Sequence, residues 1–88
     1  MKAKSGLMLR EIVGSWVIIP VGAMTVESNS IMILNGSGAL LWKKLVEGAE
    51  TSDLIQLLKS EYDVDDKTAE SNVLEFVNKL KEKNLLVG

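Results

Sequence analysis

Short apolar runs separated by turn residues dominate the first third of the chain, and this pattern is typical of β-strands. Residues 7–13 and 16–19 are rich in Leu, Ile, Val and Trp, and they flank Gly14 and Ser15. A two-residue loop that begins with glycine suits a type II′ turn, because glycine readily adopts the positive φ that this turn needs. The pattern therefore predicts an antiparallel hairpin with Gly14 and Ser15 at its tip.

A third strand is predicted at a wholly apolar run: Ile31, Met32, Ile33 and Leu34. Residues 20–30, which precede this strand, include a proline, a glycine, two serines and an asparagine. They are expected to form a loop, with a short extended piece at residues 25–26. Because all four strand residues are apolar, both faces of the strand are expected to be covered.

Apolar residues recur at helical spacing in the rest of the chain. The first helix is predicted over residues 38–47, with Ser37 as its N-cap and Gly48 at its left-handed end. A second helix is predicted from a cap at Thr51 or Ser52 to about residue 62.

The third predicted helix covers residues 66–83 after a cap at Asp65, and residues 85–87 follow as an apolar tail. Three strands followed by three helices predict an α+β fold. We expect a winged helix-turn-helix-like architecture, with an N-terminal three-stranded antiparallel β-sheet, and a single domain over residues 1–88.

The third helix has one strongly apolar face. Successive helical residues lie about 100° apart, which groups four side chains into a core face: Ala69, Val73, Phe76 and Leu80. Val77 lies at the margin of this face, and Leu74 falls outside it, beside Glu70, Val77 and Lys81. Two interpretations of Leu74 remain open: it packs on the second helix or under the tail, or it forms one wall of a groove.

Composition limits the chemistry that this chain can perform. It contains no histidine and no cysteine, and it has neither a glycine-rich phosphate loop nor the spacing of a metal site. Gly36 and Gly38 are interpreted as turn and helix-start residues. Asp63, Asp65 and Asp66 are interpreted as acids that cap the third helix and complement its dipole. We predict a protein that is not an enzyme and that needs no cofactor or metal.

Charge and hydropathy also narrow the partners. Twelve acidic and ten basic residues give a net charge of −2, and the basic residues are scattered, so no nucleic acid partner is expected. Arg10 and Glu11 interrupt the apolar stretch near the start, and no cleavage pattern follows it. The apolar run at residues 16–21 is far shorter than the roughly 20 residues that span a bilayer. We therefore expect a cytoplasmic protein with no membrane partner.

The joint between the third strand and the first helix is the most specific stretch of the sequence. It reads ILNGSGALLW over residues 33–42, and the helical sequence over residues 45–86 follows it. Together they resemble the PqqD family, the pyrroloquinoline quinone biosynthesis protein D and its relatives. The resemblance is most specific at Leu34-Asn35, Ser37-Gly38 and Trp42. In this family the fold serves as a recognition element for ribosomally made, post-translationally modified peptides.

The resemblance implies a peptide-binding function. An unfolded leader segment of a precursor peptide would add to the third strand and lie against the third helix. The domain would then present it to a modifying enzyme in trans, often a radical SAM protein. The implied docking strand is Ile31, Met32, Ile33 and Leu34. The helix-side contacts, which we infer from the helical angles, are Glu70, Leu74, Val77 and Lys81. We expect a monomer or a weak homodimer.

Alternatives from other classes remain open. The strand at residues 31–34 either is a sheet edge that accepts a peptide or is covered, so that core packing explains it. A winged-helix DNA-binding regulator fits the order of the helices, but its recognition helix would bring four acids against phosphates: Asp65, Asp66, Glu70 and Glu75. A structural or dimerisation module, in which an unpaired strand meets its own copy, is the third possibility.

Overall fold

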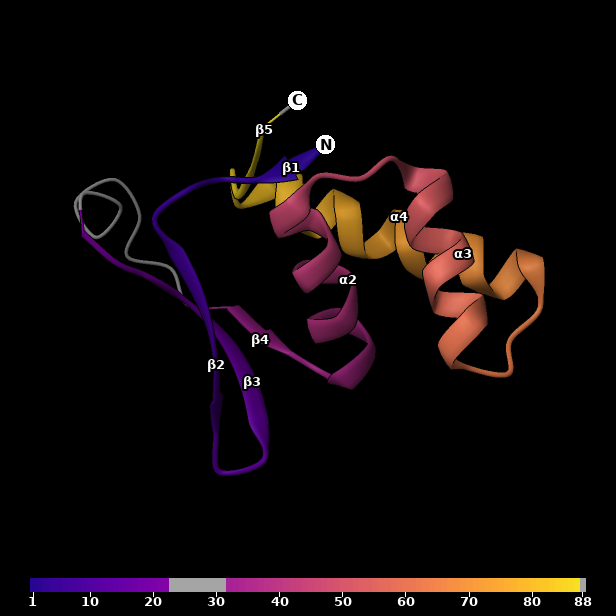
Figure 1. Cartoon of the computed structure of the whole chain (residues 1–88), viewed down its shortest axis with the longest axis horizontal. Helices are drawn as coiled ribbons and strands as arrows, with labels where there is room; N and C mark the ends of the chain where they lie inside the picture. The colour runs from indigo at the N-terminus through magenta and orange to yellow at the C-terminus, as the bar shows by residue number, and fades with distance from the viewer. Residues whose placement is uncertain (23–31, 88) are drawn as a thin grey trace.

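The fold is a small sheet followed by three helices, as the sequence predicts (Figure 1). The computed structural model describes residues 1–22 and 32–87. In chain order the elements are β1 (Lys2–Ala3), β2 (Leu7–Ile12), β3 (Ser15–Pro20), β4 (Met32–Leu34), α2 (Gly36–Glu47), α3 (Thr51–Glu61), α4 (Asp66–Glu82) and β5 (Leu86–Val87). The fold class is therefore α+β. The extended piece predicted at residues 25–26 lies outside the described residues.

The described strands form two antiparallel sheets. The larger sheet has the order β2-β3-β4, and the smaller pairs β1 with β5. The sequence predicts an apolar tail at residues 85–87, but Lys2 pairs with Val87, and Ala3 pairs with Leu86. The first and last strands of the described chain therefore lie side by side, as Figure 1 shows near the two termini.

The hairpin between β2 and β3 turns one residue earlier than predicted. Ile12 pairs with Ser15, so the tip consists of Val13 and Gly14, whose φ values of 48° and 79° fit a type I′ turn. The register explains the difference. It places Leu9 opposite the buried Ile18, whereas a tip at residues 14–15 would place Glu11 there. Apolar pairing on the core face thus outweighs the cost of a positive φ at an exposed valine.

The joint between β4 and α2 is closed by Asn35, not by the predicted Ser37. The Asn35 side-chain oxygen accepts a hydrogen bond of 2.8 Å from the Gly38 backbone N–H, and the Ser37 hydroxyl donates to the same oxygen at 2.9 Å. α2 therefore begins at Gly36, two residues earlier than predicted. A Cβ at position 38 would come within 3.3 Å of the Leu34 side chain, so glycine permits this close approach. At the other end, Gly48 has the positive φ that the sequence predicted.

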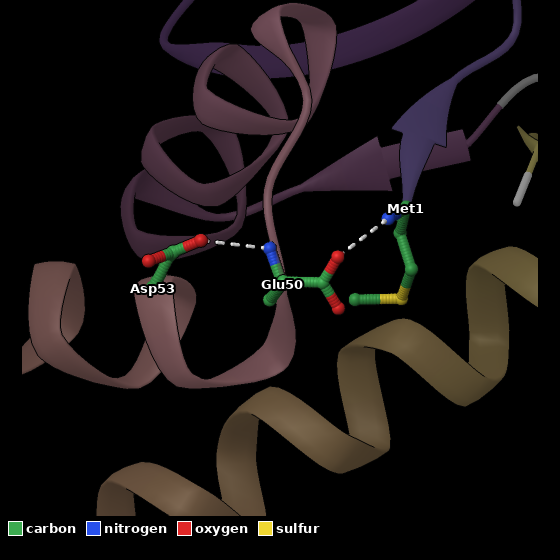
Figure 2. Close-up of polar contacts among 3 residues, drawn as sticks. All are labelled: Met1, Glu50 and Asp53. Atoms are coloured by element: carbon green, nitrogen blue, oxygen red, sulfur yellow. Dashed lines mark hydrogen bonds and ion pairs between the residues drawn. The ribbon is translucent and has the colours of Figure 1, made fainter.

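The start of α3 also ties down the N-terminal strand (Figure 2). Glu50, rather than Thr51 or Ser52, is the N-cap residue, and its backbone N–H donates to an Asp53 carboxylate oxygen at 2.9 Å. The Glu50 carboxylate lies 4.0 Å from the Met1 ammonium group. In addition, the Ala49 N–H donates to the Met1 carbonyl at 2.8 Å. The segment between α2 and α3 is thereby fixed to the start of β1.

α4 begins as predicted. The Asp65 carboxylate accepts a hydrogen bond of 2.7 Å from the Thr68 backbone N–H. Hydrogen bonding from Thr68, first through its side chain and then through its backbone, lowers the pKa of Asp65 below its ordinary value of 3.8. Lys59 of α3 forms an ion pair with Asp66, which links the two helices at this end.

The core lies between the sheet and the three helices, with α2 between the sheet and α3 (Figure 1). Trp42 of α2 is only 1% exposed and belongs to the core cluster, so its large ring anchors this helix. The core face of α4 differs by one residue from the prediction, because Val77 is buried and Phe76 is half-buried. No helix of the described residues is long and apolar enough to cross a membrane.

Candidate functional site: a cleft beside the edge strand

β4 is an edge strand of the three-stranded sheet. One side of it pairs with β3, and no described strand pairs with the other. Met32 and Leu34 are buried, whereas Ile33 is 72% exposed. The expectation that both faces are covered is therefore wrong for the described strand. Ile31, the first residue of the predicted docking strand, lies outside the described residues. An unpaired edge with an exposed β-branched residue can accept another strand.

A cleft of about 210 Å³ lies between β4 and α4. All three residues of β4 line it, and so do Asn35 and Gly38 at the start of α2. The capping hydrogen bond between these two residues fixes this end of the cleft. The N-cap of α2 therefore sets the position of the edge strand relative to the helices.

α4 forms the opposite wall of the cleft and combines an apolar floor with a polar rim. Phe76 packs against the core and keeps part of its ring open to the cleft, and Leu41 of α2 also lines it. Asn72, Glu75 and Lys79 supply polar side chains. The Lys79 ammonium lies 3.4 Å from a Glu75 carboxylate oxygen, and both side chains are exposed. The cleft thus offers both apolar contacts and hydrogen-bonding groups to a ligand.

The structure places the four predicted helix-side residues elsewhere. Val77 is 3% exposed and belongs to the core, Leu74 is 44% exposed, and Glu70 and Lys81 are exposed. None of the four lines the cleft beside β4. With about 100° per residue, Leu74 lies about 160° around the helix from Phe76. The face of α4 that lines the cleft beside β4 and the face that carries Leu74 therefore lie on opposite sides of the helix's core face.

A sequence signal for this face existed but was ambiguous. Asn72, Phe76 and Lys79 follow one another at spacings of four and three, which places them on one side of a helix. The helical angles place Phe76 in the same sector as Ala69, Val73 and Leu80, so the sequence predicts it on the core face. Its half-exposure depends on how α4 sits against β4, and helical periodicity alone does not determine that arrangement.

Within residues 1–22 and 32–87, no three Asp or Glu side chains are grouped to hold a metal ion, and no charged residue is buried. The lowered pKa of Asp65 follows from its capping role at the start of α4.

Comparison with known proteins gives a consistent family assignment, although no curated protein matches the sequence. The structure titled "TbiB1 in Complex with the TbiA(beta) Leader Peptide" is 25% identical, with a TM-score of 0.78, and the match covers 100% of this chain and 96% of that one. A second solved structure, "Lasso peptide synthetase B1 complexed with the leader peptide", is 23% identical, with a TM-score of 0.74. The match covers 99% of this chain and 96% of that one. The family described as "Coenzyme PQQ synthesis protein D (PqqD)" matches residues 21–86. Since this match spans most of the sequence, including the β4–α2 joint and the cleft, the chain belongs to the PqqD family.

Proposed function

We propose that this protein binds the leader segment of a ribosomally made precursor peptide and presents it to a separate modifying enzyme. The leader adds as an antiparallel strand to the free edge of β4. The observation that carries the proposal is the edge of β4 that no described strand pairs with, beside a cleft that reaches α4. Two solved structures of the same fold are titled as complexes with leader peptides, which supports the same role here.

Main-chain hydrogen bonds to β4 supply much of the binding, and alternate side chains of the peptide supply specificity. Side chains on the same face as Met32 and Leu34 point toward the cleft and contact Phe76. Side chains on the other face lie beside Ile33 and cover it. In this arrangement the helix-side contacts differ from the set that the sequence predicted. They are Asn72, Glu75, Phe76 and Lys79.

The leader is disordered before it binds, so part of the interaction free energy is spent on ordering it. We expect a dissociation constant from about micromolar to tens of nanomolar. The protein itself acts as a carrier without catalytic activity. The chemistry belongs to an enzyme in trans, and a radical SAM protein is the class that the family resemblance implies.

NMR titration tests the proposal. The probe is a synthetic leader of the precursor peptide encoded beside this chain's gene, and a scrambled leader of the same composition is the control. Amide shifts should concentrate on residues 32–34 and 72–79 with the true leader, and they should be absent with the scrambled one. Shifts confined to the hairpin tip and α3 would refute the docking site.

A further inference from the structure

A second apolar surface lies at the opposite edge of the three-stranded sheet, between β2 and α2. It consists of two adjoining hollows of about 350 Å³ and about 560 Å³. Both are lined by Leu7 and Val46, so they form one continuous area, which we call the β2-side surface. None of its lining residues also lines the cleft beside β4.

The exposed apolar side chains of this surface come from four separate segments of the chain. They are Met8, Val21, Val46 and Val87. The other large exposed apolar residues of the described chain are at the end of β2 and the hairpin tip next to it, on β4, at the end of α3 and on α4. Exposed apolar side chains that gather in one place are typical of surfaces that bind another protein.

The floor of the β2-side surface is preformed. Trp42 lines it and is almost completely buried, so its ring is held by the core. The Val21 backbone N–H donates to the Gly6 carbonyl at 2.8 Å, which closes the rim between β2 and β3. A partner would therefore meet a surface that needs little ordering, and this favours affinity.

Charge indicates the kind of partner. Lys2 and Lys4 line the surface, and Lys43 contributes its aliphatic stem while its ammonium lies 4.7 Å from the centre of the Trp16 ring. No Asp or Glu is among the described residues that line it, although the chain has a net charge of −2. A second copy of the chain would bring lysines against lysines across a two-fold axis, which disfavours a homodimer here.

We propose that the β2-side surface docks the modifying enzyme, through an apolar segment of that enzyme flanked by Asp or Glu side chains. This inference rests on the proposed peptide-binding function. Because β2 and β4 are opposite edges of one sheet, the leader and the enzyme bind at the same time. Holding both on one small domain raises the effective concentration of the peptide at the enzyme.

Calorimetric titration tests the docking surface. The probe is the recombinant modifying enzyme encoded beside this chain's gene. Val46→Glu places a carboxylate at the centre of the surface, and Leu74→Glu is the matched control, since both residues are about half exposed on helices, at 51% and 44%. Val46→Glu should weaken enzyme binding by about tenfold or more, and Leu74→Glu should change it by less than about twofold. Both variants should keep the wild-type leader affinity and circular dichroism spectrum.

A charge-reversal variant tests the chemistry of the partner. Lys2→Glu combined with Lys4→Glu should weaken enzyme binding several-fold, and the affinity of the wild-type protein should fall as salt is raised. Unchanged enzyme affinity in both the charge-reversed protein and Val46→Glu would overturn the proposal. So would a wild-type protein that does not bind the enzyme, or a Val46→Glu variant that differs only by losing a dimer in sedimentation.

The two proposals fail in different ways. If Ile33→Asp loses leader affinity while both Val46→Glu and the charge-reversed protein keep the wild-type enzyme affinity, peptide binding stands and the docking surface is wrong. If the leader does not bind the wild-type protein at all, the proposed function itself is wrong.

Discussion

The two edges of the three-stranded sheet differ in what they can bind. β4 has three residues, exposes Ile33 and adjoins a cleft with both apolar and polar walls. β2 has six residues, and its exposed Arg10 and Glu11 discourage the addition of another strand. Its exposed apolar side chains are Met8, which lines the hollow shared with α2, and Ile12, which lies next to the hairpin tip. One edge suits an extended peptide, and the other suits the surface of a folded protein.

Both edges depend on α2, so the largest effect is expected from loss of its anchor. Trp42 lines the β2-side surface, and its neighbour Leu41 lines the cleft. Trp42→Ala should lower the free energy of unfolding by about 3–5 kcal/mol, because it leaves a large cavity in the core. Urea denaturation measures this loss. Val46→Ala, at an exposed position of the same helix, should change stability by less than about 0.5 kcal/mol. Equal losses in the two variants would contradict the role of Trp42.

The second prediction separates the β4 edge from the outer side of α4. Ile33→Asp should weaken leader binding by about 1–3 kcal/mol, because it places a charge where the added strand must pack. Leu74→Asp is the control and should leave binding within about 0.5 kcal/mol, since Leu74 does not line the cleft. Fluorescence anisotropy with a labelled leader measures both. If Leu74→Asp proves the more damaging, the helix face predicted from the sequence is the right one.

The third prediction concerns the joint that positions β4. Asn35→Ala removes the acceptor for the Gly38 N–H and should cost about 1 kcal/mol of stability. Ser37→Ala, which removes only a donor to that acceptor, should cost less. Thermal or urea unfolding of the two variants gives the comparison. A larger loss in Ser37→Ala would restore Ser37 as the capping residue.

The smallest effect is a pH dependence at the start of α4. The pKa of Asp65 is lowered in the folded state, so its contribution to stability is present above the ordinary value of 3.8 and is lost as pH falls through the folded value. Asp65→Asn keeps an N-cap acceptor but does not titrate. The urea midpoint of the wild-type protein should therefore fall more than that of Asp65→Asn between about pH 6 and about pH 3. Parallel profiles would show that Asp65 does not carry this dependence.

The elements themselves could be predicted because local patterns specify them. The cap at Asp65 and the helix end at Gly48 both follow from short-range chemistry. The pairing of Lys2–Ala3 with Leu86–Val87 could not be predicted, since two-residue strands have no period to detect and their partners lie at opposite ends of the sequence.

Errors at the candidate site arose where tertiary packing decides between equal local choices. Asn35 and Ser37 are both good N-caps, and only the exit of the chain from β4 selects the first. Similarly, a helix has two sides next to its core face, and the side of Phe76, not that of Leu74, lines the cleft beside β4. Which side contacts a leader peptide stays a prediction. The strand itself needed no such choice, because a short apolar strand before a turn is a local signal. Its role in docking a peptide stays a prediction.

Inter-strand nuclear Overhauser effects test the central claim most directly. Isotope-labelled protein would be mixed with unlabelled leader, and isotope-filtered spectra would record contacts between the two chains. We predict backbone contacts between the leader and residues 32–34 in an antiparallel register, together with side-chain contacts to the Phe76 ring. A leader that contacts the β2-side surface instead, or that binds without backbone contacts to β4, would contradict the account.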